Sequence, residues 1–234
     1  QVAKYNDDFE PRAFGDNIQK WGTSTILIES GGLRGDPEKQ KTRELNYVAL
    51  LTAFDAIMEK SYQKYRLENY YRIPDNERYL HELLIRNAAV DYQGNTYQLD
   101  LGFKSEETSY AANRRYYQRS SIADVGDLST YFGYEEVDAT GMRVVDGKVY
   151  PTTLGSLDEL QNLALLELQK EGYLYLKIGN LKGDAHLKQE LPLQIIDAER
   201  TVKNSYKVGS NPAFYLEKDG RKMYAVVNGI LYKM

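Results

Sequence analysis

The sequence predicts an α+β protein in which one strand and one helix precede a mainly β region with a short helical insert. A run of β-branched and aliphatic residues at 24–28 is typical of a strand, and apolar residues at helical spacing follow at 45–56. The remainder alternates short apolar runs with glycine-containing turns, which is typical of β-structure. A hydrophobic content of 42% and a charged content of 27% indicate a folded chain rather than a disordered one.

Composition excludes several classes of function. A formal net charge of −4 argues against nucleic acid as a partner, because phosphate recognition requires clustered Lys and Arg. No apolar run approaches the roughly 18–20 residues that cross a bilayer, so we expect no membrane span. The chain has no cysteine, which excludes disulfides and thiol chemistry and fits either the cytoplasm or a periplasm with few disulfides.

The segment from Trp21 to Gly32, WGTSTILIESGG, contains the first candidate site. The expected strand at 24–28 ends in one carboxylate, Glu29, which is followed by Ser30-Gly31-Gly32. A carboxylate at a strand end is held rigidly, and the glycines let a substrate or a metal approach the backbone. From spacing alone, a buried strand with a polar end is the more frequent alternative, since most strands carry no chemistry.

A helix is expected over residues 37–62. Asp36 is placed to cap its first turn. Leu45, Val48 and Leu51 lie on an apolar stripe that is too broad for a lone surface helix, so the stripe requires a sheet to pack against. We expect the burial of these three side chains to contribute about 1.5–3 kcal/mol each.

Residues 5–58 resemble the last strand and the last helix of a zinc carboxypeptidase of the carboxypeptidase A type, in its secreted bacterial subgroup. The resemblance implies that this part is a strand-helix remnant of an α/β catalytic domain. It also implies that Glu29 is the general base that activates a zinc-bound water. A peptide substrate cleaved at its C-terminus, Tyr5 as a substrate-binding residue, and a periplasmic or secreted location follow from the same resemblance.

The metal ligands of that family are missing from the sequence. The family holds zinc with a His-x-x-Glu pair and a second histidine, whereas His81 is followed three residues later by Leu84 and His186 by Gln189. Catalytic zinc needs three protein ligands and an open position. We therefore expect zinc only in a parent enzyme, with no metal held and no activity shown by this chain alone. The chain is then the C-terminal piece of a longer enzyme or a degenerate relative.

The apolar face of the expected helix needs a partner, which the missing upstream catalytic segment supplies in the resembled family. For this chain three arrangements remain open: packing on the β-sandwich of the second half, exchange into a neighbouring copy in a homo-oligomer, and a rearranged sheet. The tyrosine-rich connector is a further candidate to cover the face. A tyrosine- and charge-rich stretch at 63–76 reads as a linker. The expected domains are therefore a carboxypeptidase-like segment at 1–62 and a mainly β domain at 77–234.

Hairpin signals organise the second half. Strands are expected at 83–91 and 96–103, on either side of Gln93-Gly94-Asn95. Residues 104–120 are polar and carry no strong signal, and Asp219-Gly220 predicts a later hairpin.

A helical insert interrupts these strands. Ser156 and Glu159 form a capping box that predicts a helix over 156–171, which Gly172 ends. A strand is expected directly afterwards, at 173–178.

Residues 83–151 and 208–234 resemble the β-sandwich of metal-dependent amidohydrolases. In that family the proline that ends the first block leads into a His-x-His metal motif, but Pro151 is followed by TTLGSLDELQ, which has no histidine. The insert at 152–207 is too short for a (β/α)₈ barrel, which takes about 250 residues. The resemblance therefore implies a sandwich-like domain without the amidohydrolase active site.

Two functions remain. The first is the C-terminal portion of a zinc metallocarboxypeptidase that carries the general base, with an accessory β-sandwich. The second is a non-catalytic binding domain for peptide, glycan or a partner domain. The 21 tyrosines would suit such a surface, with clusters at 62–71 and 110–117, although packing is the more frequent use of tyrosine. Asp124, Asp127 and Asp138 are assigned to turns rather than to calcium, which takes about 6–8 oxygens from one site.

Overall fold

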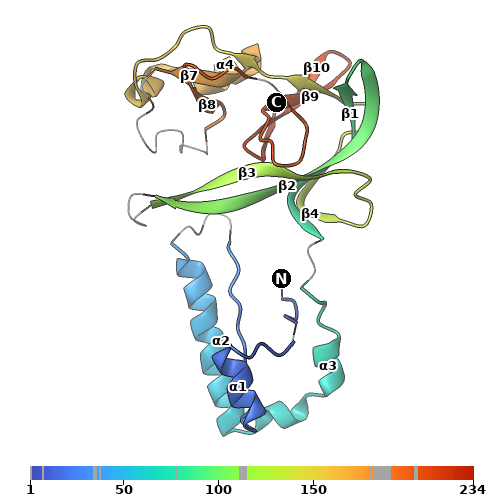
Figure 1. Cartoon of the computed structure of the whole chain (residues 1–234), viewed down its shortest axis with the longest axis vertical. Helices are drawn as coiled ribbons and strands as arrows, with labels where there is room; N and C mark the ends of the chain where they lie inside the picture. The colour runs from blue at the N-terminus through green and yellow to red at the C-terminus, as the bar shows by residue number, and fades with distance from the viewer. Residues whose placement is uncertain are drawn as a thin grey trace. The chain divides into compact units, whose positions relative to one another are not determined.

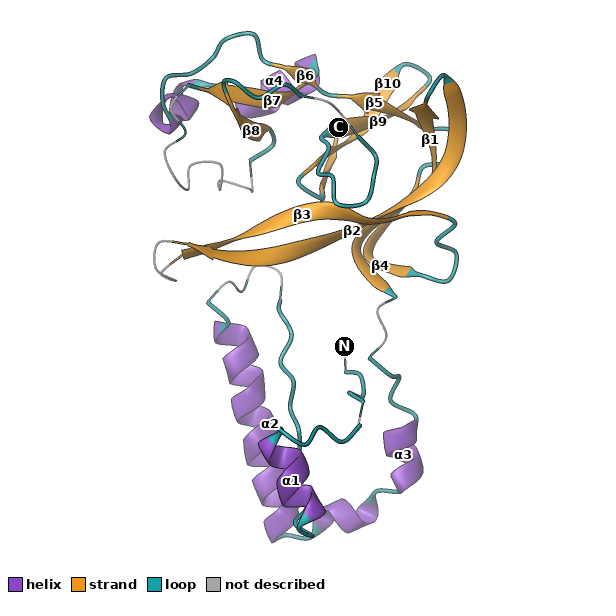
Figure 2. Cartoon of the chain, in the orientation of Figure 1, coloured by secondary structure: helices purple, strands orange, loops and turns teal. Residues whose placement is uncertain are grey.

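The protein divides into two compact units, Gln1–Arg78 and Tyr79–Met234. The computed structural model describes residues 2–6, 8–33, 36, 38–76, 79–110, 115–179, 181, 191–202 and 205–234. Helices dominate the first unit and strands the second, so the α+β class expected from the sequence is confirmed (Figure 2). None of the helices in the described part of the chain is long and apolar enough to cross a membrane.

The first unit consists of helices and loops. Its helices are α1 (Phe14–Lys20), α2 (Gln40–Met58), the 3₁₀-helix η1 (Ser61–Lys64) and α3 (Leu67–Tyr71). The stretch expected to be a linker is thus partly helical. It is tied to the N-terminal segment by an isolated bridge between Lys4 and Asp75, whose side chains also form a salt bridge of 2.7 Å.

Asp36 caps α2, as the sequence predicts. Its carboxylate accepts hydrogen bonds from the backbone N–H of Lys41 (3.1 Å) and of Thr42 (2.8 Å). Burial disfavours the charged carboxylate, but these hydrogen bonds outweigh burial and hold the pKa of Asp36 below its ordinary value. The helix begins at Gln40 rather than at residue 37, because Lys39 adopts a left-handed conformation with φ of 55°.

The apolar stripe of α2 is exposed, so the expected burial is wrong for this chain. Leu45, Val48 and Leu51 are 66%, 54% and 49% exposed. Among the described residues of the first unit, only Asp36 is buried. The described residues of this unit form no sheet that could cover the stripe. Packing therefore contributes little to the stability of α2 here, although packing supplies most of the stability of helices in proteins.

The strand expected at 24–28 does not form either. Residues 23–33 belong to no helix or strand, and Ile26 and Leu27 are 68% and 66% exposed. The backbone of residues 24–32 makes no hydrogen bond to the backbone of another described residue. A strand needs a neighbouring strand to pair its N–H and C=O groups, and the first unit offers none in its described part. The segment instead runs as an extended chain (Figure 1).

The second unit is built on a large curved sheet (Figure 1). The strand order is β11-β10-β9-β5-β1-β2-β3, and β4 pairs with β1. The strands are β1 (Leu80–Tyr92), β2 (Asn95–Tyr110), β3 (Arg115–Gly126), β4 (Phe132–Asp138), β5 (Arg143–Asp146), β9 (Phe214–Lys218), β10 (Arg221–Val227) and β11 (Ile230–Lys233).

The predicted hairpins are confirmed. Gln93 and Gly94 join β1 to β2 with φ of 50° and 81°, and Asp219 and Gly220 join β9 to β10 with φ of 51° and 76°. Positive φ at both central residues matches the right-handed twist of the flanking strands. In the stretch 104–120, which carries no strong sequence signal, the described residues 104–110 and 115–120 pair and extend β2 and β3 into a long antiparallel ribbon.

A smaller parallel sheet, β6-β7-β8, carries the insert. Strand β7 spans 173–178 as expected, but the helix expected over 156–171 is broken into two short helices. The predicted capping box of Ser156 and Glu159 is present at the start of the first of them, where Glu159 accepts a hydrogen bond from the Ser156 N–H (3.1 Å). The elements are β6 (Lys148–Val149), η2 (Leu157–Asn162), α4 (Leu165–Glu171), β7 (Tyr173–Ile178) and β8 (Gln194–Asp197).

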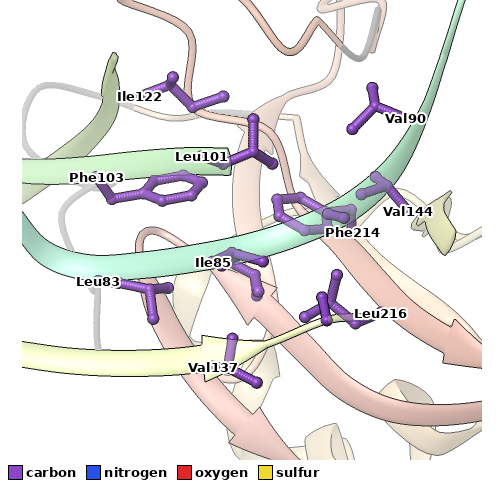
Figure 3. Close-up of a cluster of buried hydrophobic side chains, with 13 residues drawn as sticks. Leu83, Ile85, Val90, Leu101, Phe103, Ile122, Val137, Val144, Phe214 and Leu216 are labelled. Atoms are coloured by element: carbon purple, nitrogen blue, oxygen red, sulfur yellow. The ribbon is translucent and has the colours of Figure 1, made fainter. Parts of the chain in front are cut away.

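Strand β9 separates two hydrophobic cores. Phe214 and Leu216 point into the first core, where Phe214 stacks on Phe103 of β2 with ring centroids 6.3 Å apart (Figure 3). Tyr215, between them, points into the second core against Leu174 of β7. Side chains of β9 thus alternate between the first core, which β1 and β2 share, and the second core, which β7 and β8 of the small sheet share. The expected sandwich-like layering is present in the second unit.

Candidate functional site

Glu29 lies in the extended segment of the first unit. Its side chain is exposed, and the described residues offer it no hydrogen bond or ion pair. The segment is attached to α2 directly after Glu29, where Asn46 Nδ2 donates to Ser30 Oγ over 2.6 Å. Glu29 is therefore accessible beside α2, without the rigid strand end that the sequence predicts for it.

Tyr5 is not brought to Glu29 by any described contact. Its side chain is 54% exposed, next to the bridge between Lys4 and Asp75. No ring contact or hydrogen bond joins Tyr5 to Glu29 in the described part of the chain. The substrate-binding role of Tyr5 stays a prediction.

The described residues do not fit a catalytic zinc site. They contain no group of three His, Asp or Glu side chains placed to hold a metal ion. His81 lies on β1 in the second unit, while His186 and Gln189 lie outside the described residues. Because catalytic zinc takes three protein ligands, any zinc chemistry would need ligands from outside these residues.

His81 is a buried histidine with unusual surroundings. It is 2% exposed, and neither ring nitrogen has a hydrogen-bond partner among the described residues. Its ring lies 5.2 Å from the ring of Tyr131. Burial lowers the pKa of His81, Lys104 lowers it further, and Asp124 opposes the shift. The imidazole is therefore neutral at pH 7.

Protonation of His81 should destabilise the folded protein. Its pKa is lower in the folded than in the unfolded state, so the unfolded state takes up the proton first as the pH falls below about 6.5. We expect the free energy of unfolding to decrease from pH 7 to pH 5, and His81→Leu to flatten that decrease. Urea unfolding at several pH values measures both. His186→Gln, at the other histidine of the sequence, is the control. If the free energy of unfolding of His81→Leu decreases between pH 7 and pH 5 as steeply as that of the parent chain, His81 is not the cause of the decrease.

Two of the three acidic side chains considered for calcium serve turns, as expected, whereas Asp124 lies in strand β3 and accepts a hydrogen bond from the Val125 N–H (2.8 Å). Asp127 accepts a hydrogen bond from the Ser129 N–H (3.0 Å). Asp138 accepts from both the N–H (3.0 Å) and the hydroxyl of Thr140 (2.6 Å). These hydrogen bonds hold the pKa of both carboxyls below the ordinary range.

A cluster around Arg86 is also structural. Its guanidinium donates to Glu136 (3.0 Å) and to the carbonyl oxygens of Leu128 (3.2 Å) and Tyr131 (2.8 Å). The hydrogen bond from Arg86 keeps the pKa of Glu136 low. The guanidinium thus ties the loop between β3 and β4, and Glu136 of β4, to β1.

One pocket of about 1080 Å³ opens in the second unit. Its apolar wall comes from β1, β2, β3 and β5, at the end of the first core that adjoins the β1–β2 hairpin. Tyr92 and Tyr97 flank the wall and are 52% and 45% exposed. The apolar side chains are Val90, Leu99, Val125, Val144 and Val145.

Charged side chains of both signs line the same pocket. Arg143 lies 3.8 Å from Asp91, and the Tyr206 hydroxyl donates a short hydrogen bond to Asp146 Oδ1. Burial and the neighbouring Asp146 raise the pKa of Tyr206, so its hydroxyl stays protonated and donates. Lys207 adds a second positive charge to the lining.

Sequence reasoning missed this pocket and favoured other tyrosines. The cluster at 62–71 is exposed, with Tyr65 73% and Tyr71 65% accessible, but it lines no described pocket. The side chains at 110–117 lie outside the described ones. A signal for the pocket was present in the sequence. Val90 and Tyr92 are two residues apart on one predicted strand, and Tyr97 and Leu99 are two residues apart on the next. Because Val90 pairs with Tyr97, all four side chains lie on one face of the sheet.

Comparison with known proteins adds little. No family model and no curated protein matches the chain. Among solved structures, the N-acyl-D-glutamate deacylase from Bordetella bronchiseptica, complexed with zinc and a phosphonate inhibitor, aligns at 20% identity and a TM-score of 0.31. The alignment covers 43% of this chain and 19% of the deacylase. Similarity at that level defines neither fold nor activity, so a proposal about function rests on the residues of this chain and their surroundings.

Proposed function

We propose that this chain is part of a larger metallocarboxypeptidase. Its first unit would complete an α/β catalytic domain, and its second unit would be an accessory β domain. The reaction would be hydrolysis of the last peptide bond of a peptide. A periplasmic or secreted location belongs to the same proposal, since it comes from the resemblance to the secreted bacterial subgroup.

The exposed apolar surface of the first unit carries this proposal. A 19-residue helix with none of its residues buried gains almost no packing energy within its own unit. Covering Leu45, Val48 and Leu51 would contribute about 1.5–3 kcal/mol each. Residues 24–28 also lack a partner strand, although their composition is typical of a buried one. A sheet supplied from outside the unit would satisfy both needs, with the segment as one strand and α2 packed on a face.

Glu29 would then stand at the end of that added strand. Its carboxylate is exposed and free of described partners, so no described residue of the unit competes for it. A carboxylate in such a place can accept a proton from the attacking water. The zinc of this reaction would be held by residues outside the described ones, because no suitable group of ligands occurs among them.

Hydrolysis assays on two lengths of the protein test the proposal. The probe is a set of blocked dipeptides with different C-terminal residues, and zinc content is measured in parallel. We expect the longer protein to bind zinc and release the C-terminal residue, whereas residues 1–234 alone do neither. Stoichiometric zinc with turnover by residues 1–234 would overturn the proposal. A longer protein that folds with zinc and releases no residue from any dipeptide would also overturn it.

A further inference from the structure

We propose that the pocket beside the β1–β2 hairpin of the second unit binds a neutral saccharide of one or two rings. This site is independent of Glu29 and of the hydrolysis proposed above. It combines an apolar wall, two exposed tyrosine rings and two polar pairs, Arg143 with Asp91 and Tyr206 with Asp146. Its volume of about 1080 Å³ exceeds the lower limit of about 300 Å³ for ligand pockets.

The balance of charge favours a neutral ligand. Arg143 and Lys207 bring two positive charges to the pocket, and Asp91 and Asp146 bring two negative ones. An anionic ligand that approached Arg143 would also meet Asp91, only 3.8 Å from the guanidinium. Since like charges in one site repel, neither an anion nor a cation gains from the whole lining.

The polar groups match the hydroxyls of a sugar. Tyr206 fixes the orientation of Asp146 by donating to Oδ1, while Oδ2 makes no hydrogen bond to a described residue and can accept one from a ligand. The guanidinium of Arg143 belongs to a side chain that is 58% exposed and offers donors in a planar fork. Each hydroxyl of a sugar ring can both donate and accept a hydrogen bond. Adjacent hydroxyls can therefore donate to Asp146 and accept from Arg143 at the same time.

The tyrosines supply the apolar part of recognition. Val90 and Tyr97 are directly paired across the hairpin strands, which places the Tyr97 ring beside the valine wall. A pyranose ring has one face of C–H groups that packs on an aromatic ring, and tyrosine offers such a ring with a hydrogen-bonding end. Tyr92 and Tyr97 remain 52% and 45% exposed, so their rings are accessible to a ligand.

Peptide binding is less suitable at this place. An extended peptide usually gains its affinity by pairing with a free sheet edge. Residues 90–92 of β1 pair with β2, and residues 143–146 of β5 pair with β9, whereas β1 and β5 pair with each other only at Ala89 and Arg143. An extended peptide would find only these short stretches of each strand open on one side, so side chains supply most of what the pocket offers to a small ligand.

Chemical-shift mapping on the full chain tests the proposal. The probes are maltose, cellobiose and N,N′-diacetylchitobiose, with a blocked alanine tripeptide as the competing ligand class. We expect one of the three sugars to bind with a Kd near about 1 mM and to shift the backbone amides of 90–99 and 143–146. Tyr97→Ala and Arg143→Gln should each weaken that binding about tenfold.

Two matched variants control for nonspecific effects. Tyr134→Ala removes a tyrosine that is 72% exposed on β4, and Arg221→Gln removes an exposed arginine of β10; neither lines the pocket. Both should bind as the parent chain does. The proposal is overturned if none of the sugars binds at about 10 mM, if the tripeptide binds there instead, or if the control variants weaken binding as strongly as Arg143→Gln. Arg143 is exposed, so its replacement leaves the fold intact even if Tyr97→Ala does not.

Discussion

Glu29→Gln in the longer protein should lower peptide hydrolysis about 10²–10⁴-fold while zinc remains bound at full stoichiometry. The amide has nearly the shape of the carboxylate but does not take up a proton at neutral pH, so only the proton transfer is removed. The Michaelis constant should change little, because the effect lies in the transition state. Initial rates of release of the C-terminal residue, together with elemental analysis for zinc, measure both quantities.

A neighbouring acid provides the matched control for Glu29. Glu38 is exposed and precedes α2, and the structure gives it no hydrogen bond or ion pair to a described residue. Glu38→Gln removes the same charge from the same unit and should leave the rate within about twofold, as for a surface substitution of about 0.4 kcal/mol or less. Turnover of Glu29→Gln close to that of Glu38→Gln would remove Glu29 from the role of general base.

Local signals in this sequence predicted local structure well. The turns at Gln93-Gly94 and Asp219-Gly220, the strand at 173–178 and the capping role of Asp36 all depend on residues close together in the chain. Each is determined by backbone sterics or by one hydrogen bond a few residues away. Such features need no knowledge of the rest of the fold.

Features that depend on distant partners were predicted less well. The segment 24–28 and α2 have the composition of buried elements, but burial needs a second surface, which the described first unit does not provide. The ribbon formed by residues 104–110 and 115–120 shows the converse case, because pairing between β2 and β3 creates strands where the hydrophobic pattern is weak. Composition therefore indicated which residues need partners, without indicating whether this chain contains them.

The two candidate sites also differ in whether their residues are close together or far apart in the sequence. Glu29 is visible in sequence because the acid and its glycines are contiguous. The pocket joins Val90 of β1 to Val144 of β5, which the pairing of Ala89 with Arg143 brings together, and to the loop at 205–207, which Tyr206 ties to β5 by its hydrogen bond to Asp146. A contact between strands so far apart in sequence depends on the topology of the whole sheet, and no short motif encodes it.

Gly102→Ala should destabilise the second unit strongly, by about 3 kcal/mol, the upper part of the usual cost of overpacking a core. A Cβ at Gly102 would lie 2.6 Å from Cε1 and 2.7 Å from each nitrogen of the His81 ring. The ring has little room to move, since it is 2% exposed and lies against Tyr131. The added methyl group must therefore displace a central strand or the ring. Urea unfolding followed by circular dichroism measures the loss.

A double-mutant cycle with His81 assigns the cause. His81→Ala alone should also destabilise, because it leaves a cavity in a packed region. In the His81→Ala background the alanine at 102 meets open space, so Gly102→Ala should then cost about 1 kcal/mol or less, a coupling of about 2 kcal/mol. Gly179→Ala is the control, since its nearest neighbour would be at an ordinary 3.5 Å. Equal costs of Gly102→Ala in both backgrounds would show that the His81 ring does not fill this space.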